Sequence, residues 1–360
     1  MASSRSRSSL ATPTDHGSVP LSLQSGVGSI ILPGVRRAKP VLAVSKCTGQ
    51  ALEPPEAARV AESANGMSDV GVVVRRVEEA GAICTLQASD LSAAHQLSCQ
   101  AGWNQTPADW QRLLAWEPEG CFVLALDGAI AGTVTTTRYG SRLAWIGMLL
   151  VDAALRRRGF GQRLLLHALS WLGDTGVGVV MLDATPLGQP LYERLGFRPQ
   201  CLLDRWQGVA SAAVSGRRTS KLGPAGLSSA LLDLDQRAFG LDRSRLLRDL
   251  QTAPKAQSIA IGAVEATSGY VLLRPGSQCW HVGPLVAEDG DTAERLLQAA
   301  LAALDGQPVE VDVPRLQAAQ EIVRRAGLSP ARPFVRMLRG GPAPPVDWSL
   351  IYASAAPEIG

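Results

Sequence analysis

Arg156-Arg157-Arg158-Gly159-Phe160-Gly161, the RRRGFG stretch at 156–161, decides the fold because it joins a predicted strand to a predicted helix. Glycines lack the Cβ atoms that block close approach, so successive backbone N–H groups can point into one concavity at the helix N-terminus. Such a concavity suits a diphosphate, and the three arginines supply charge for that anion or a neighbouring phosphate. Taken alone, the stretch is also compatible with an ordinary basic turn whose arginines are solvated.

Two other phosphate-binding motifs are excluded at this loop. No Gly-Lys-Ser/Thr follows, as a Walker loop requires. No β-α-β unit of the Rossmann form brackets the glycines.

The segments around the loop predict a fixed order of strands and helices. Alternating or 3.6-residue apolar spacing marks each one, with Thr106 and Pro107 at the start of the second helix and Gly173 at the end of the third. The predicted elements are a strand at 72–77, helices at 89–101 and from 107, an antiparallel meander at 121–126, 130–138 and 143–151, a helix at 161–172, a strand at 177–183 and a helix at 190–195.

The length and composition of the chain exclude several classes of protein. The chain has 360 residues, 46% hydrophobic and 19% charged, which favours two domains and excludes a wholly disordered chain. No apolar run reaches the ~18–20 residues of a membrane-spanning helix. The six cysteines form no CxxC pair and no Cys/His cluster, so we expect no metal site.

The net charge of +3 resides entirely in residues 1–66. The rest of the chain is formally neutral, which argues against a nucleic-acid binder. Residues 1–66 are rich in Ser, Arg, Gly and Pro and lack periodicity, so they are predicted to be a disordered extension. They fit an organelle transit peptide or a segment upstream of a true start at Met67. We therefore expect a soluble intracellular protein, cytoplasmic or, with a transit peptide, plastid or mitochondrial.

An internal repeat divides the remainder into domains at 67–206 and 230–360, joined by a small, polar, Gly/Pro-bearing linker at 207–229. Trp145-Ile146-Gly147 corresponds to His281-Val282-Gly283. The second copy lacks four residues in the loop where the first reads RRRGFG, and it carries Val323 in place of Tyr192. One active and one degenerate copy is the expectation.

The strand at 143–151, the RxxGxG loop, the helix, the next strand and the LYERLGF run at 191–197 resemble, in order and spacing, the central motifs of the GNAT (GCN5-related) N-acetyltransferases. The resemblance covers roughly residues 70–206. The second half, including 239–247, 281–297 and IYASAAPEIG at 351–360, resembles the C-terminal GNAT-like domain of YitH-type tandem members.

This resemblance implies an α/β (α+β) fold of two tandem domains, each with a mixed central sheet, splayed middle strands and flanking helices. It implies that acetyl-CoA is the cosubstrate. The pantetheine arm would pair with the backbone of one splayed strand, and its diphosphate would bind at the glycine loop. The coenzyme-binding residues are then Met148, Leu149, Leu150, Val151, Arg156, Arg157, Arg158, Gly159, Phe160 and Gly161.

Catalytic roles follow from the same resemblance. Tyr192 matches the general acid that protonates the departing thiolate, although a core tyrosine is the alternative. The general base is not identified by the motifs. Glu119 is a candidate, together with Glu117 and Asp183. Trp103 and Asn104 lie in the region that covers the acceptor groove in this family, and packing is the alternative for both.

The expected function is acetyl transfer from acetyl-CoA to a primary amine of a small molecule, by direct attack in a ternary complex. The alternatives are a protein or peptide acetyltransferase and a non-catalytic acyl-CoA sensor. In the second copy, 287–291 (AEDGD) occupies the loop position, and its three carboxylates would repel a diphosphate, so no coenzyme is expected there. We expect no nucleic-acid or membrane partner, and the sequence predicts no oligomeric state.

Overall fold

The computed structural model describes residues 81–212 and 226–360. The predicted strand at 72–77 and the predicted disordered extension lie outside these ranges. We call 81–212 the first copy and 226–350 the second copy, and we name 351–360 the closing segment.

The first copy follows the predicted order of elements. Its second helix begins as expected, since the Thr106 hydroxyl accepts a hydrogen bond from the Asp109 amide at 3.2 Å and the Asp109 carboxylate accepts one from the Thr106 amide at 2.8 Å. The elements are β1 (Ala82–Thr85), a short 3-10 helix (Ala88–Asp90), α2 (Leu91–Gln100), α3 (Pro107–Trp116), β2 (Phe122–Leu126), β3 (Ala129–Tyr139), β4 (Leu143–Val151), a second 3-10 helix (Ala153–Leu155), α4 (Phe160–Asp174), β5 (Val179–Ala184), α5 (Gln189–Arg194) and β6 (Arg198–Val209).

The second copy repeats this order without the extra first strand. Ser228 caps its first helix by accepting a hydrogen bond from the Leu231 amide, and Gly240 ends that helix in the left-handed region. The elements are α6 (Ser229–Phe239), α7 (Ser244–Gln251), β7 (Gln257–Ala263), β8 (Ala266–Pro275), β9 (Trp280–Ala287), α8 (Gly290–Ala303), β10 (Pro308–Pro314), α9 (Gln317–Arg325) and β11 (Ser329–Gly340); β12 (Ile351–Ala353) follows in the closing segment.

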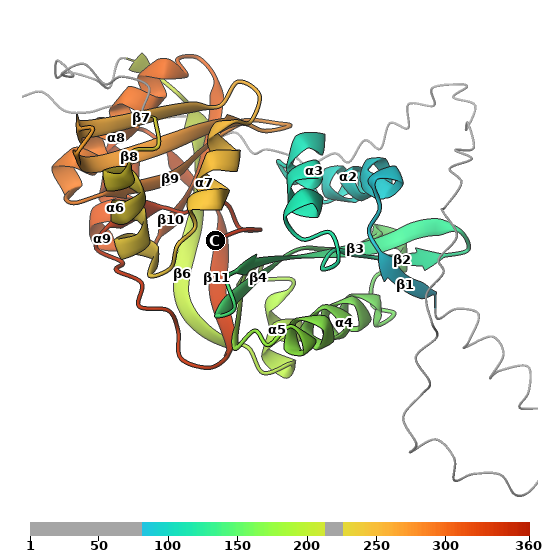
Figure 1. Cartoon of the computed structure of the whole chain (residues 1–360). Coiled ribbons are helices and arrows are strands. Elements are labelled where there is room, and N and C mark those ends of the chain that lie inside the picture. Colours follow the sequence, from blue (N-terminus) through green and yellow to red (C-terminus); the bar gives the residue numbers. More distant parts are fainter. Residues whose placement is uncertain (1–80, 213–225) are drawn as a thin grey trace, which may run out of the picture. The chain divides into compact units, whose positions relative to one another are not determined.

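One mixed sheet runs through both copies. In the described residues its strand order is β1-β2-β3-β4-β5-β11-β6-β10-β9-β8-β7, with β12 paired to β9. Figure 1 shows α4 and α5 on one side of the first copy's strands and α2 and α3 on the other. The mixed sheets and flanking helices expected for the two copies are confirmed, and they are joined edge to edge.

The junction is made by exchanged strands. The last strand of the second copy, β11, pairs with β5 of the first, and the last strand of the first copy, β6, pairs with β10 of the second. Because Val209 pairs with Pro308, β6 extends three residues into the range predicted to be linker.

Two buried ion pairs hold the exchange. Arg205 on β6 donates two hydrogen bonds of 2.7 Å to Asp312 on β10, and Arg336 on β11 donates two of 2.8 Å to Asp183 on β5. The two arginines occupy the same repeat position, nine residues after Gly196 and Gly327 respectively. Each copy therefore supplies the cation for the carboxylate of the other.

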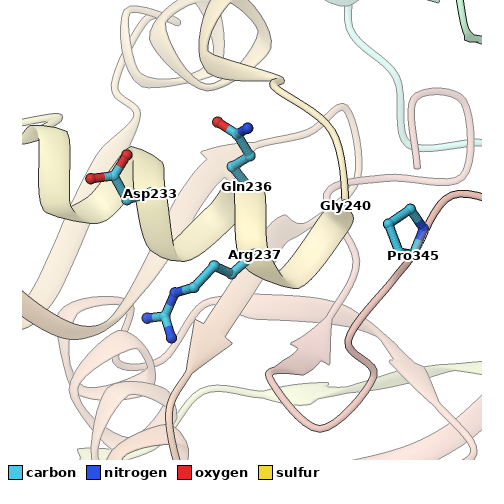
Figure 2. Close-up of a pocket in the computed structure, with 5 residues that line it drawn as sticks. All are labelled: Asp233, Gln236, Arg237, Gly240 and Pro345. Atoms are coloured by element: carbon cyan, nitrogen blue, oxygen red, sulfur yellow. The ribbon is translucent and has the colours of Figure 1, made fainter.

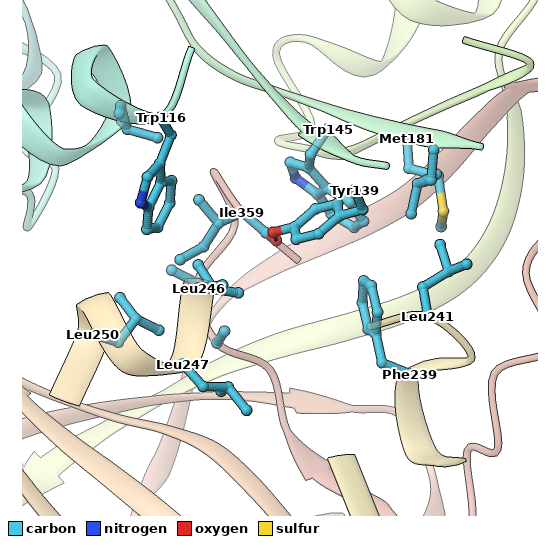
Figure 3. Packing of buried hydrophobic residues seen from close by; sticks show 14 of the residues in the cluster. Trp116, Tyr139, Trp145, Met181, Phe239, Leu241, Leu246, Leu247, Leu250 and Ile359 are labelled. Carbon is cyan, nitrogen blue, oxygen red and sulfur yellow. Dashed lines mark hydrogen bonds between the residues drawn. The ribbon is translucent and has the colours of Figure 1, made fainter. Parts of the chain in front are cut away.

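Apolar packing crosses the junction as well. One buried cluster joins Trp116 and Trp145 of the first copy to Phe239 and Leu247 of the second and to Ile359 of the closing segment. Figure 3 shows these side chains gathered in one cluster, together with Tyr139, Leu246 and Leu250. Burial on this scale makes the two copies one packed unit.

Candidate active site

A cavity of about 960 Å³ opens where β4 and β5 part. These parallel strands pair only from Leu143 to Trp145 on β4, with Val179 to Met181 as partners on β5, although both continue further. Beyond Trp145 each strand presents its backbone to the cavity instead of to the other. The splayed strands implied by the family resemblance are therefore present in the first copy.

The RxxGxG loop forms one wall. Gly159 lies in the left-handed region at φ +83°, as N-cap of α4, and a Cβ built on it would have no heavy atom within 4 Å. The Arg163 amide makes the hydrogen bond to the Gly159 carbonyl, so the amides of residues 160–162 precede the first helical bond. Arg156, Arg157, Gly159, Phe160 and Gly161 line the cavity, whereas Arg158 does not.

A bulge in β4 directs the backbone of this strand toward the cavity. The register against β3 shifts between Thr133 and Thr135, and Met148 has φ +48°, unusual for a residue with a side chain. The Thr133 hydroxyl donates a 2.8 Å hydrogen bond to the Met148 carbonyl and holds the bulge. All four predicted strand residues, 148 to 151, line the cavity.

Tyr192 on α5 also lines the cavity. Its ring packs edge-on against Phe197, with centroids 5.8 Å apart, and a Cβ at Gly188 would lie 2.9 Å from it. Burial raises the pKa of Tyr192, so the phenol stays protonated at neutral pH. The residue is thus a packed aromatic ring whose hydroxyl keeps its proton at neutral pH.

At the far end of the cavity lie Trp103, Gln105 and Glu358. Glu358 comes from the closing segment and accepts a 2.9 Å hydrogen bond from the Gln105 side-chain amide. Burial, with the charge of Asp109 second, raises the pKa of Glu358. The segment is held over β4 by the Trp145 indole, which donates to the Pro357 carbonyl at 2.8 Å.

Sequence reasoning missed Glu358. Its segment shows no periodicity, and the one available signal is a single carboxylate in an otherwise uncharged stretch, ASAAPEIG at 353–360. Arg205, Arg332 and Phe334, from the exchanged strands, also line the cavity and were not predicted.

Other predicted site residues lie elsewhere. Asn104 docks the first copy on the second: it donates to the Cys279 carbonyl and to Glu310, both at 3.0 Å, and accepts from the amides of Gln278 and Cys279. Glu119 is exposed in the turn before β2 and is not among the residues that line the cavity.

The remaining carboxylates that the sequence suggested as bases are held by arginines. Glu117 accepts two 2.7 Å hydrogen bonds from Arg138, and Asp183, although it lines the cavity, is occupied by Arg336. Neither oxygen pair is available to an amine.

In the second copy the equivalent opening is filled by the protein itself. Strands β9 and β10 pair only at Trp280 and His281, and β12 then pairs with β9 through Ile351 and Ala353. The Ser354 amide donates to the Asp312 carbonyl at 2.8 Å, which closes the other side. A Cβ on Gly283 would lie 2.1 Å from the Ser354 carbonyl oxygen.

The helix that follows this filled opening begins with a carboxylate. Asp289 is the N-cap of α8 and accepts a hydrogen bond from the Thr292 amide at 2.7 Å. An anionic side chain thus sits where the first copy has an open glycine.

A smaller hollow of about 440 Å³ lies at the end of α6, between Gly240 and Pro345. Figure 2 shows Arg237 extending away from Asp233 and Gln236, so the polar groups that line this hollow do not converge on a common point. We assign no chemistry to it.

Within residues 81–212 and 226–360, no group of three or more His, Cys, Asp or Glu side chains is placed to hold a metal ion. None of the helices in these ranges is both long enough and apolar enough to cross a membrane.

Family models match both copies. A model described as the acetyltransferase (GNAT) family matches residues 90–197, and one described as an acetyltransferase (GNAT) domain matches residues 231–353. The two matches together cover most of the described chain.

Three curated relatives agree with this result. The holothin acyltransferase of Pseudoalteromonas sp. (strain SANK 73390) is 24% identical over 72% of this chain and 87% of its own length, and the uncharacterized N-acetyltransferase YitH of Bacillus subtilis is 28% identical over 64% and 80%. A probable glucosamine 6-phosphate N-acetyltransferase 2 of rice is 31% identical over 40% of this chain and 90% of its own length.

Proposed function

From the premise that this chain belongs to the GNAT acetyltransferase family, we propose that its first copy transfers an acetyl group from acetyl-CoA to a primary amine of a small molecule. The observation that carries the proposal is the single cavity that joins the glycine loop and the unpaired backbone of β4 to Tyr192 and Glu358. The second copy supplies part of that cavity and binds no coenzyme.

The residues present fit the coenzyme. Open space at Gly159 and the N-terminus of α4 suit a diphosphate, with Arg156 and Arg157 beside it. The bulged backbone at 148–151 would hold the pantetheine arm. When bound, acetyl-CoA supplies an activated thioester whose carbonyl oxygen gains negative charge as an amine attacks, and a fixed main-chain donor near Met148 lowers that barrier.

Tyr192 is the proposed general acid. A thiolate leaving the thioester needs a proton, and the phenol of Tyr192 retains one because burial raises its pKa. Val323 occupies the corresponding place in the second copy and has no proton to give.

Glu358 is the proposed general base. An amine must lose its ammonium proton before it attacks, and Glu358 is the cavity-lining carboxylate that no arginine pairs with in the described chain. Its raised pKa brings it nearer to working pH than an exposed glutamate. Gln105 fixes its orientation.

A small acceptor is favoured because the closing segment packs closely against β4 where it borders the cavity. The closing segment crosses β4, since a Cβ at Gly147 would lie 2.6 Å from the Glu358 carbonyl oxygen. Trp103 and Pro357 line the cavity beside this crossing. The rice relative is named for glucosamine 6-phosphate, which is a small-molecule amine.

The test is release of free thiol from acetyl-CoA in the presence of purified protein and a panel of small amines, with a lysine peptide as a separate arm. Turnover with at least one small amine and none with the peptide is the expected result. Acetyl-CoA binding without turnover on any amine overturns the proposal in favour of a sensor. Preferential turnover of the peptide overturns it in favour of a protein acetyltransferase.

A further inference from the structure

We propose that the acceptor carries an anionic group, a carboxylate or a phosphate, that binds Arg332 while its ammonium faces Glu358. This inference rests on the proposed function and narrows its substrate to zwitterionic amines. The residue that carries it comes from the second copy: Arg332 lies on β11, the strand inserted between β5 and β6 of the first copy.

Arg332 lines the cavity, and the nearby charges of Asp312 and Glu310 act on it without forming an ion pair. Its Nε is buried and makes no hydrogen bond, and in the described chain no carboxylate forms an ion pair with its guanidinium. The guanidinium lies over the ring of Phe334, with its central carbon 4.8 Å from the ring centroid, so its direction is fixed by packing. Burial, followed by the charge of Arg205, lowers the pKa of Arg332.

The carboxylates nearest in charge to Arg332 are already paired with another arginine, Arg205. Arg205 faces Arg332 across the β6–β11 pairing, but it is bonded to Asp312 and contacts Glu310 at 3.1 Å. Asp183 is neutralised by Arg336. Arg332 and Glu358 line the same cavity, and neither side chain forms an ion pair in the described chain.

A guanidinium with free donors in a partly enclosed site binds carboxylates and phosphates in paired hydrogen bonds. The same positive charge repels a second ammonium, so a polyamine is disfavoured. Partial desolvation adds to the preference, because an acceptor that lacks the anion leaves the half-buried Arg332, with its buried Nε, without a hydrogen-bond partner there.

The experiment compares matched acceptors in the thiol-release assay on the full chain. Each pair differs only by the anion: β-alanine against propylamine for a carboxylate, and glucosamine 6-phosphate against glucosamine for a phosphate. We expect kcat/KM to favour the anionic member of at least one pair by about 100-fold, the size expected from a hydrogen bond to a charged group. The pair that shows the preference identifies the anion.

Arg332→Gln is expected to remove this preference while leaving affinity for acetyl-CoA, measured by calorimetry, within about twofold. Arg339→Gln is the matched control, since Arg339 is an exposed arginine on the same strand outside the cavity. If wild type acetylates both members of each pair equally, or if Arg332→Gln retains the preference, the inference is wrong and the proposed function stands. If Arg332→Gln weakens acetyl-CoA instead, Arg332 belongs to the coenzyme site. Absence of turnover with every amine counts against the proposed function itself.

Discussion

The two copies share one frame and use its central opening in opposite ways. In the first copy β4 and β5 part to leave the cavity, while in the second copy the gap between β9 and β10 is filled by β12. The closing segment contributes to both openings. Its residues 351–354 fill the opening of the second copy, and residues 357–358 line the cavity of the first copy. The segment that fills the opening of the second copy thus also lines the cavity of the first.

The comparison also shows which residues are the same in both copies. Arg205 and Arg336 keep matching positions and matching aspartates, because those pairs hold the exchanged strands. The glycine loop and Tyr192 do not hold the exchanged strands, and the second copy has neither. Groups present in both copies therefore mark the shared frame, and the groups to which we assign the chemistry are present in one copy only.

The largest effect is expected from breaking one of the two buried pairs. Asp183→Asn leaves Arg336 fully buried without a counter-charge, and the free energy of unfolding should fall by about 3–5 kcal/mol. Asp312→Asn should cost less, about 1–3 kcal/mol, because Glu310 remains 3.1 Å from Arg205. Urea unfolding of both variants measures the difference. Equal losses would show that Glu310 does not compensate.

The helix-start loops of the two copies are compared by placing a glutamate in each. Gly159→Glu puts a carboxylate, and a strained left-handed backbone, where the diphosphate is proposed to lie, and should weaken acetyl-CoA by at least about 100-fold, or 2.7 kcal/mol. Gly290→Glu, in the loop of the second copy, should leave affinity unchanged. Calorimetry on wild type should give one coenzyme per chain.

Gly159→Asn separates charge from backbone strain, since asparagine tolerates the left-handed region. It should weaken acetyl-CoA much less than the glutamate does. Undiminished affinity in folded Gly159→Glu protein would falsify the placement of the diphosphate.

The second copy has Val323 in place of Tyr192, so a substitution of Tyr192 tests whether this difference between the copies determines which of them is active. Tyr192→Phe should lower kcat by about 100-fold, the usual contribution of a general acid, with little change in acetyl-CoA affinity. Tyr352→Phe is the control, because Tyr352 lies in the filled opening of the second copy. Turnover of Tyr192→Phe at the wild-type rate would make this tyrosine a packing residue only.

The sequence predicted the elements whose signals are local. The apolar stripe of α4, the meander of β2 to β4 and the Thr106 cap are all as expected, because each depends on spacing within one segment. The exchange of β6 and β11 depends on pairing between residues more than a hundred positions apart, such as Arg205 with Asp312. The apolar spacing within a single segment cannot predict such pairing.

The site divides in the same way. The glycine loop and Tyr192 could be read from motif spacing, and the structure brings them to one cavity. Glu358 and Arg332 reach that cavity only through the closing segment and the exchanged strand. Asn104 was predicted to lie in the acceptor site because of its position in the sequence. In the structure its side-chain amide instead donates hydrogen bonds to Glu310 and to the Cys279 carbonyl, and so links the first copy to the second.

The smallest effect we predict is a shift in pH dependence. Burial raises the pKa of Glu358, so its carboxylate becomes protonated at a higher pH than an exposed glutamate and can then accept no proton. As pH falls through that raised pKa, wild-type kcat/KM should fall about tenfold per pH unit, as for loss of one essential base. Glu358→Gln should be slower at neutral pH and lack this acidic limb. Glu288→Gln, an exposed carboxylate of the second copy, is the control and should keep the limb. An unchanged profile in Glu358→Gln would move the base to another group or to water, and would leave the closing segment as a wall of the acceptor pocket without a part in proton transfer.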